Sequence, residues 1–221
     1  MNSPELYRLI SWLSPSFPIG AYMFSHGLEY AAEAGLVSNR TELQDWIETV
    51  LRFGTGRVDA MLIRAAYEAT EEELQDIIEL ASAMKGTSEL SKESRSQGQA
   101  FKRTVESAWH CDLSGIRQGE SLQGPYSVSV ALACKGSNIP LTDVLTAYLH
   151  AFASNLVSAA MRLIPIGQTD GQMTVASMAN VVAEVVDDAI RSPLTDIGSS
   201  TSMVDWTSMQ HESQHTRLFR S

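Results

Sequence analysis

Cysteine is scarce in this sequence, which has two among 221 residues, Cys111 and Cys134. Two cysteines can form at most one disulfide, which excludes the heavily cross-linked scaffolds of small secreted proteins. Free cysteine is among the most often buried residue types, so we interpret both as ordinary core thiols.

Positive charge is also scarce. The chain has 16 Lys and Arg against 26 Asp and Glu, a formal net charge of −10. No basic stripe is long enough to neutralise several phosphates, so nucleic acid is not expected as a partner. Neither G-x-x-x-x-G-K-[ST] nor G-x-G-x-x-G occurs, and we expect the chain not to bind ATP, GTP or NAD by itself.

A long uninterrupted apolar run is missing as well. The most apolar stretch, 147–166, contains His150, Asn155, Arg162 and Pro165, and we interpret it as a buried helix rather than a membrane span. No segment near the start resembles a signal peptide. The expectation is a cytoplasmic protein without a membrane partner.

What the sequence does contain is helical periodicity along most of its length. Apolar residues recur at helical spacing, and two pairs read as capping boxes, Thr41 with Gln44 and Thr70 with Glu73. Ser3 followed by Pro4 predicts the start of an opening helix. Residues 127–134 alternate weakly, but no comparable partner strand exists, so we predict a helix there too.

These patterns predict an all-α fold, with a single globular domain of about ten helices over residues 1–192. Turns are expected at 111–124 and 167–171, where glycine is frequent. From residue 193 to 221 the periodicity is lost and Ser, Thr and Gly increase, which predicts a flexible tail. This tail carries Trp206, Met209, Leu218 and Phe219, so it either docks onto a partner or folds back on its own domain.

One motif in the tail is typical of an enzyme. His211, Glu212 and His215 fit H-E-x-x-H, in which two histidines on one helix bind zinc and the glutamate activates water. Only six residues follow His215, and the preceding segment is rich in Ser and Thr. A small zinc hydrolase is therefore one hypothesis, beside a solvated helix and a surface metal contact through His211 and His215. No G-x-S-x-G elbow or paired Cys and His is present, so no catalytic residue is named.

Several stretches of the chain resemble the urease accessory protein family UreF. They are LSPSFPIGAY at 13–22, SHGLE at 25–29, EAGLV at 33–37, RLIPIGQTDGQ at 162–172 and RLFRS at 217–221. The stretches lie at the start, middle and end, so the similarity covers essentially the whole chain. It is looser between residues 70 and 124.

The resemblance implies a non-catalytic, homodimeric, all-α scaffold for maturing urease. It implies binding to UreD, also called UreH, recruitment of the GTPase UreG, and delivery of Ni²⁺ to the urease apoprotein. Nickel would be cargo, GTP would be bound by UreG, and this chain would hold no stable cofactor. The end pattern of the family contains the His-Glu pair but does not require a second histidine four residues later. His215 therefore makes the zinc motif look accidental.

Carried over residue by residue, the resemblance implies that Tyr22 and Arg217 shape the surface that receives UreG. It implies that residues 207–221 become ordered when UreD docks. Leu218, Phe219 and Ser221 of the RLFRS run are the further partner-binding candidates. A helical adaptor unrelated to nickel is the alternative function.

Overall fold

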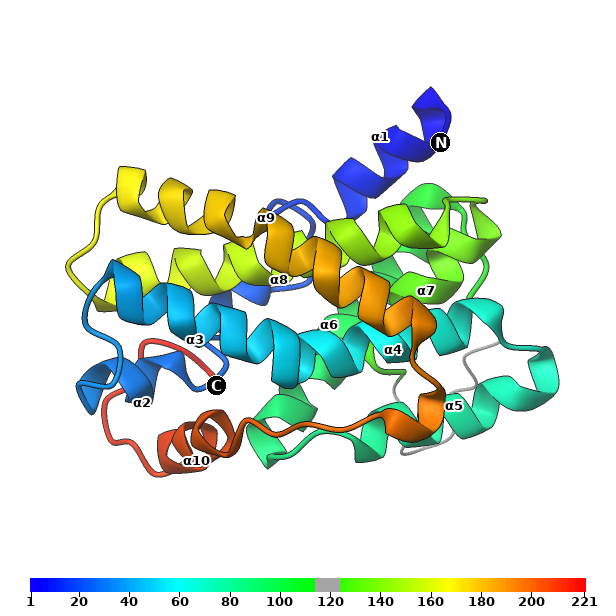
Figure 1. Ribbon diagram of the computed structural model, residues 1–221. Helices are drawn as coiled ribbons and strands as arrows, with labels where there is room; N and C mark the ends of the chain where they lie inside the picture. The colour runs from blue at the N-terminus through cyan, green and yellow to red at the C-terminus, as the bar shows by residue number, and fades with distance from the viewer. Residues whose placement is uncertain (114–123) are drawn as a thin grey trace.

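A computed structural model describes residues 1–113 and 124–221, and every regular element within these ranges is a helix (Figure 1). In chain order they are α1 (Ser3–Trp12), the 3₁₀ turn η1 (Ala21–Met23), α2 (Leu28–Glu33), α3 (Arg40–Phe53), α4 (Thr55–Glu68), α5 (Glu71–Ala83), α6 (Ser88–Trp109), α7 (Tyr126–Gly136), α8 (Leu141–Leu163), α9 (Gln168–Arg191), η2 (Leu194–Asp196) and α10 (Ser202–His211). The predicted all-α fold is confirmed, and so is the helix at 127–134.

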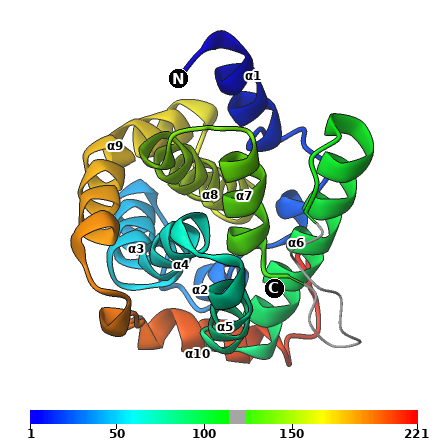
Figure 2. The same cartoon turned by 90° about the vertical axis from the view of Figure 1, so that its right-hand side faces the viewer.

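The core is built around α4, which lies in the middle of the bundle when it is viewed end on (Figure 2). This helix packs against α3, α5, α7, α8 and α9. Its buried residues lie on nearly every side, including Val58, Met61, Leu62 and Ile63. A helix that is apolar all round belongs inside a bundle.

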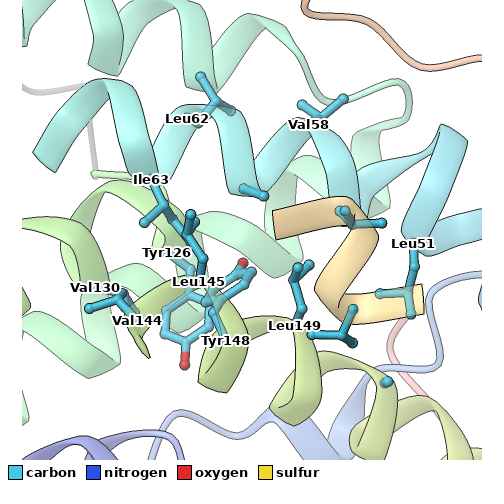
Figure 3. Close-up of a cluster of buried hydrophobic side chains, with 14 of the residues drawn as sticks. Leu51, Val58, Leu62, Ile63, Tyr126, Val130, Val144, Leu145, Tyr148 and Leu149 are labelled. Carbon is cyan, nitrogen blue, oxygen red and sulfur yellow. The ribbon is translucent and has the colours of Figure 1, made fainter. Parts of the chain in front are cut away.

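Polar side chains also lie within this core. Asp59 of α4 is buried and accepts hydrogen bonds from Lys85 Nζ at 2.7 Å and from the Tyr148 hydroxyl at 2.8 Å. The Tyr148 ring lies beside that of Tyr126, with centroids 5.5 Å apart (Figure 3). Pairing the buried carboxylate with a cation and a hydroxyl offsets the cost of removing it from water.

The apolar helix α8 packs against α9, α4 and α3. Among the described residues it is the one helix long and apolar enough to cross a bilayer by length and composition, and half of its most apolar window is buried inside the fold. This agrees with the prediction of a buried helix at 147–166.

Helix starts show where local sequence signals were sufficient. Thr70 and Glu73 form the predicted capping box at α5. At α3, however, the N-cap is Asn39 rather than Thr41, and at α1 it is Asn2 rather than Ser3. Asparagine accepts from the first free backbone N–H groups as well as Ser or Thr does, so the sequence signal placed these two N-caps one or two residues too late.

Two predicted turns have different outcomes. The 167–171 segment is mostly helical, because α9 already begins at Gln168. Most of the predicted 111–124 loop lies outside the described residues.

Both cysteines are free; Cys134 is buried, and its burial raises the pKa of the thiol.

The final segment departs from the prediction of a flexible tail. Residues 193–221 cross the lower face of the bundle in Figure 1 and form α10, which packs against α2 and α6. The buried face of α10 includes small polar residues, since both Thr207 and Ser208 are fully buried. Of the two alternatives left open by the sequence, the structure has the tail folded back on its own domain.

Candidate partner-binding surface

The loop before α2 is shaped to present Tyr22. Gly20 has a φ of +74°, a left-handed conformation that favours glycine, and it directly precedes the turn η1. The Tyr22 side chain in this turn is 63% exposed. Its backbone carbonyl accepts a hydrogen bond from Arg162 Nη2 at 3.0 Å, so the loop is fixed to the end of α8.

The last residues of the chain pair with the backbone that follows this loop. The Arg220 amide donates to the Met23 carbonyl at 2.8 Å, and the Ser25 amide donates to the Ser221 carbonyl at 2.7 Å. Phe219 is buried, and its ring lies under the Arg162 guanidinium. Burial lowers the pKa of Arg162. The tail, the Tyr22 loop and the end of α8 therefore form one continuous surface.

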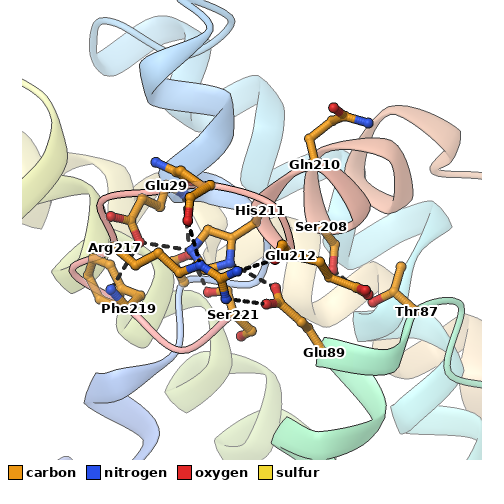
Figure 4. A network of polar contacts seen from close by, with 12 residues as sticks. Glu29, Thr87, Glu89, Ser208, Gln210, His211, Glu212, Arg217, Phe219 and Ser221 are labelled. Carbon is orange, nitrogen blue, oxygen red and sulfur yellow. Dashed lines mark hydrogen bonds and ion pairs between the residues drawn. The ribbon is translucent and has the colours of Figure 1, made fainter.

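A buried polar cluster holds the tail in this position (Figure 4). His211 Nε2 lies 2.9 Å from Glu29 Oε2 of α2, and His211 Nδ1 lies 2.8 Å from Glu89 Oε2 of α6. Arg217 Nη1 donates to Glu89 Oε1 at 3.1 Å. Glu29 also accepts from the backbone amides of Leu218 and Phe219. Every carboxylate in the cluster thus has a donor from the tail.

The predicted partner-binding residues differ in exposure. Tyr22, Arg217 and Leu218 are exposed, Leu218 at 61%. Phe219 and Ser221 are buried, so they anchor the tail rather than offer a free surface. Contact of these residues with a partner stays a prediction.

The zinc hypothesis does not match the geometry of the motif. Helix α10 ends at His211, so His215 does not lie one turn further along the same helix. His211 is fully buried with both ring nitrogens facing carboxylates, whereas His215 is exposed. Across residues 1–113 and 124–221, no group of three His, Cys, Asp or Glu side chains is arranged to hold a metal ion.

Trp206 and Met209 of the tail are named by the sequence analysis, but Met203 and the residues that hold this surface together escaped it. Met203, Trp206 and Met209 recur every third position on α10 and are all exposed, which places them along one side of the helix. Contiguous exposed apolar residues mark interaction sites. Glu29, Glu89 and Arg162 hold the surface together, yet their spacing in the sequence gives no sign of it.

Comparison of the sequence with known proteins identifies the family of this chain. The family model UreF matches residues 37–179. The chain belongs to the UreF family. Among its relatives are proteins named urease accessory protein UreF from Granulibacter bethesdensis and Bradyrhizobium diazoefficiens. Both are 43% identical to this chain, over 98% and 100% of it and over 94% and 93% of their own lengths.

The UreF relatives carry the name of an accessory protein and not of an enzyme. This UreF chain is accordingly non-catalytic, as the sequence predicted. The matched region begins at residue 37 and ends within α9, so the Tyr22 loop and the tail lie outside the family model but inside the alignment with the Bradyrhizobium relative, which covers the whole chain.

Proposed function

We propose that this chain is a non-catalytic scaffold for urease maturation. In this proposal it binds UreD, also called UreH, and the GTPase UreG, so that Ni²⁺ reaches the urease apoprotein as UreG hydrolyses GTP. Nickel is cargo and GTP belongs to UreG, so this chain needs no resident cofactor. A cytoplasmic homodimer is part of the same proposal.

The observation that carries the proposal is the folded tail with its exposed apolar side. Met203, Trp206 and Met209 line α10, and Leu218 is a further exposed apolar residue of the tail. Large exposed aromatic and methionine side chains are enriched at protein interfaces. We assign this side to UreD.

The second surface is the Tyr22 loop, which we assign to UreG together with Arg217. The tail lies against this loop through Arg220 and Ser221, so docking on α10 stabilises the backbone next to Tyr22. Once the first partner has ordered this backbone, less conformational entropy is lost when the second partner binds.

Matched substitutions test the two surfaces separately. Met209→Ala should weaken co-purification with UreD about tenfold, whereas Met173→Ala on α9, where methionine is equally exposed at 50%, should not. Tyr22→Ala should weaken UreG recruitment, whereas Tyr7→Ala on α1 should not. Thermal unfolding should move little in all four variants, because surface substitutions usually change stability by less than about 0.5 kcal/mol.

The decisive experiment is complementation of cells that lack UreF. Restored nickel content and urease activity support the proposal. Nickel-free, inactive urease in the presence of folded chain and all matched partners contradicts it and favours a helical adaptor unrelated to nickel.

A further inference from the structure

A pocket with a volume of about 220 Å³ opens beside Tyr22. Its mouth is formed by Pro15, Tyr22, Ser154 and Ser158, which line the pocket and are partly or fully exposed. The volume is below the about 300–1,000 Å³ of pockets that hold drug-sized ligands, so it matches a single long side chain.

The walls of the pocket are largely apolar and its floor is charged. Leu13, Phe17 and Phe152 contribute to the walls, whereas Asp59, Lys85 and Glu93 lie at the floor. The Asp59 carboxylate is paired with Lys85 at 2.7 Å, so these two charges offset each other.

Glu93 is the carboxylate of the floor that has no lysine or arginine partner among the described residues. Its oxygens accept from Gln97 Nε2 at 3.2 Å and from the Ser221 hydroxyl at 3.0 Å, both neutral donors. Glu93 is buried, and a buried carboxylate is costly unless a positive charge lies close to it.

His26, also buried, faces Glu93 with an unpartnered nitrogen. His26 Nε2 bonds to the Thr55 hydroxyl at 2.9 Å, while Nδ1 has no hydrogen-bond partner and lies 3.4 Å from Glu93 Oε2. The Thr55 hydroxyl can donate to Nε2, so that Nδ1 carries the ring hydrogen and faces Glu93 Oε2, but 3.4 Å is too long for a strong hydrogen bond. The buried Glu93 carboxylate is therefore left without a close cationic donor among the described residues, and a positively charged group that enters the pocket would supply one.

We propose that this pocket receives a lysine or arginine side chain from a partner protein. The aliphatic stem lies along Phe17 and Phe152, and the charged head donates to the Glu93 carboxylate. Long basic side chains commonly bury their stems while the head bonds elsewhere. The net charge of −10 favours approach of a basic partner. The inference does not depend on which partner supplies the side chain.

The test uses n-butylammonium, the side chain of lysine, as a probe of the full-length chain. The ring resonances of His26 are followed by nitrogen-15 NMR while the probe is added. We expect a saturable shift of these resonances, and binding of the neutral control 1-butanol at least tenfold weaker. Glu93→Gln should weaken butylammonium binding at least tenfold, whereas Glu79→Gln at an exposed position on α5 should leave it unchanged.

Two results overturn the proposal. One is equal binding of 1-butanol, which makes the pocket merely apolar. The other is a His26 ring that carries hydrogen on both nitrogens and does not respond to the probe, since His26 itself is then the partner of Glu93. If circular dichroism shows that Glu93→Gln is unfolded, Ser154→Phe serves as the second test variant. The larger side chain narrows the mouth of the pocket and leaves the charged residues of its floor in place. Retained butylammonium binding in folded Ser154→Phe contradicts the proposal.

Discussion

The guanidinium carbon of Arg162 lies 4.2 Å from the centroid of the Phe219 ring. This cation–π contact joins the end of α8 to the third-last residue of the chain. Contacts of this kind contribute about 0.5–2 kcal/mol, more when the cation is removed from water. Because Phe219 is also buried, this residue is the apolar anchor of the segment that follows α10.

Phe219→Ala should therefore release the tail without unfolding the bundle. Amide hydrogen exchange of residues 212–221 should accelerate at least tenfold, while exchange in α4 and α8 stays unchanged, because local opening leaves the core intact. Leu218→Ala, at the exposed neighbouring position, is the control and should leave exchange as it was. Unchanged exchange in Phe219→Ala would show that the polar cluster alone holds the tail.

His211→Ala should destabilise the protein much more than His215→Ala. Removing His211 deprives Glu29 and Glu89 of their shared buried hydrogen-bond partner, and a buried polar group that loses its partner costs about 1–3 kcal/mol. His215 is exposed, so its replacement should cost less than about 0.5 kcal/mol. Urea unfolding of both variants measures the difference. Equal, small effects would mean that Arg217 can satisfy both carboxylates.

The same histidine shows what the sequence could and could not predict. Periodicity and capping residues were sufficient for long helices such as α5, because those signals act over a few residues. The carboxylates that face His211 lie 182 and 122 positions away in the chain. No local pattern connects residues at such separations, so the sequence alone left His211 open to three interpretations: a zinc motif, a solvated helix or a surface metal contact.

The helix α10 in the tail could not be predicted for a related physical reason. Hydrophobic periodicity counts large apolar residues, but α10 buries small hydroxyl groups. Thr207 Oγ1 bonds to the Val204 carbonyl, and Ser208 shares a 2.7 Å hydrogen bond with Thr87 of the α6 N-cap. Buried hydroxyls with partners are acceptable in a core, although their sequence resembles that of a flexible linker.

Gly98 in the middle of α6 should not tolerate a side chain. A Cβ atom there would lie 2.1 Å from the carbonyl oxygen of Gly124, which belongs to backbone and cannot easily move. Gly98→Ala should lower the free energy of unfolding by about 1–3 kcal/mol, although alanine is the better helix former. Gly136→Ala at the end of α7, where a Cβ has open space, is the matched control. Thermal unfolding compares the two, and a stabilised Gly98→Ala would contradict the close contact.

Tyr126 and Tyr148 should make the fold sensitive to alkali. Burial is the largest cause that raises the pKa of both phenols above their ordinary value, and the charge of Asp59 raises both further. The unfolded chain ionises its tyrosines at about pH 10, whereas the folded chain keeps these two neutral to higher pH. The free energy of unfolding should thus be unaffected below about pH 10 and fall as the pH rises above it, by about 1.4 kcal/mol per pH unit for each phenol. Tyr126→Phe should remove one phenol's share of that slope, measured by urea unfolding between pH 7 and 11, and an unchanged slope would show that Tyr126 ionises in the folded protein.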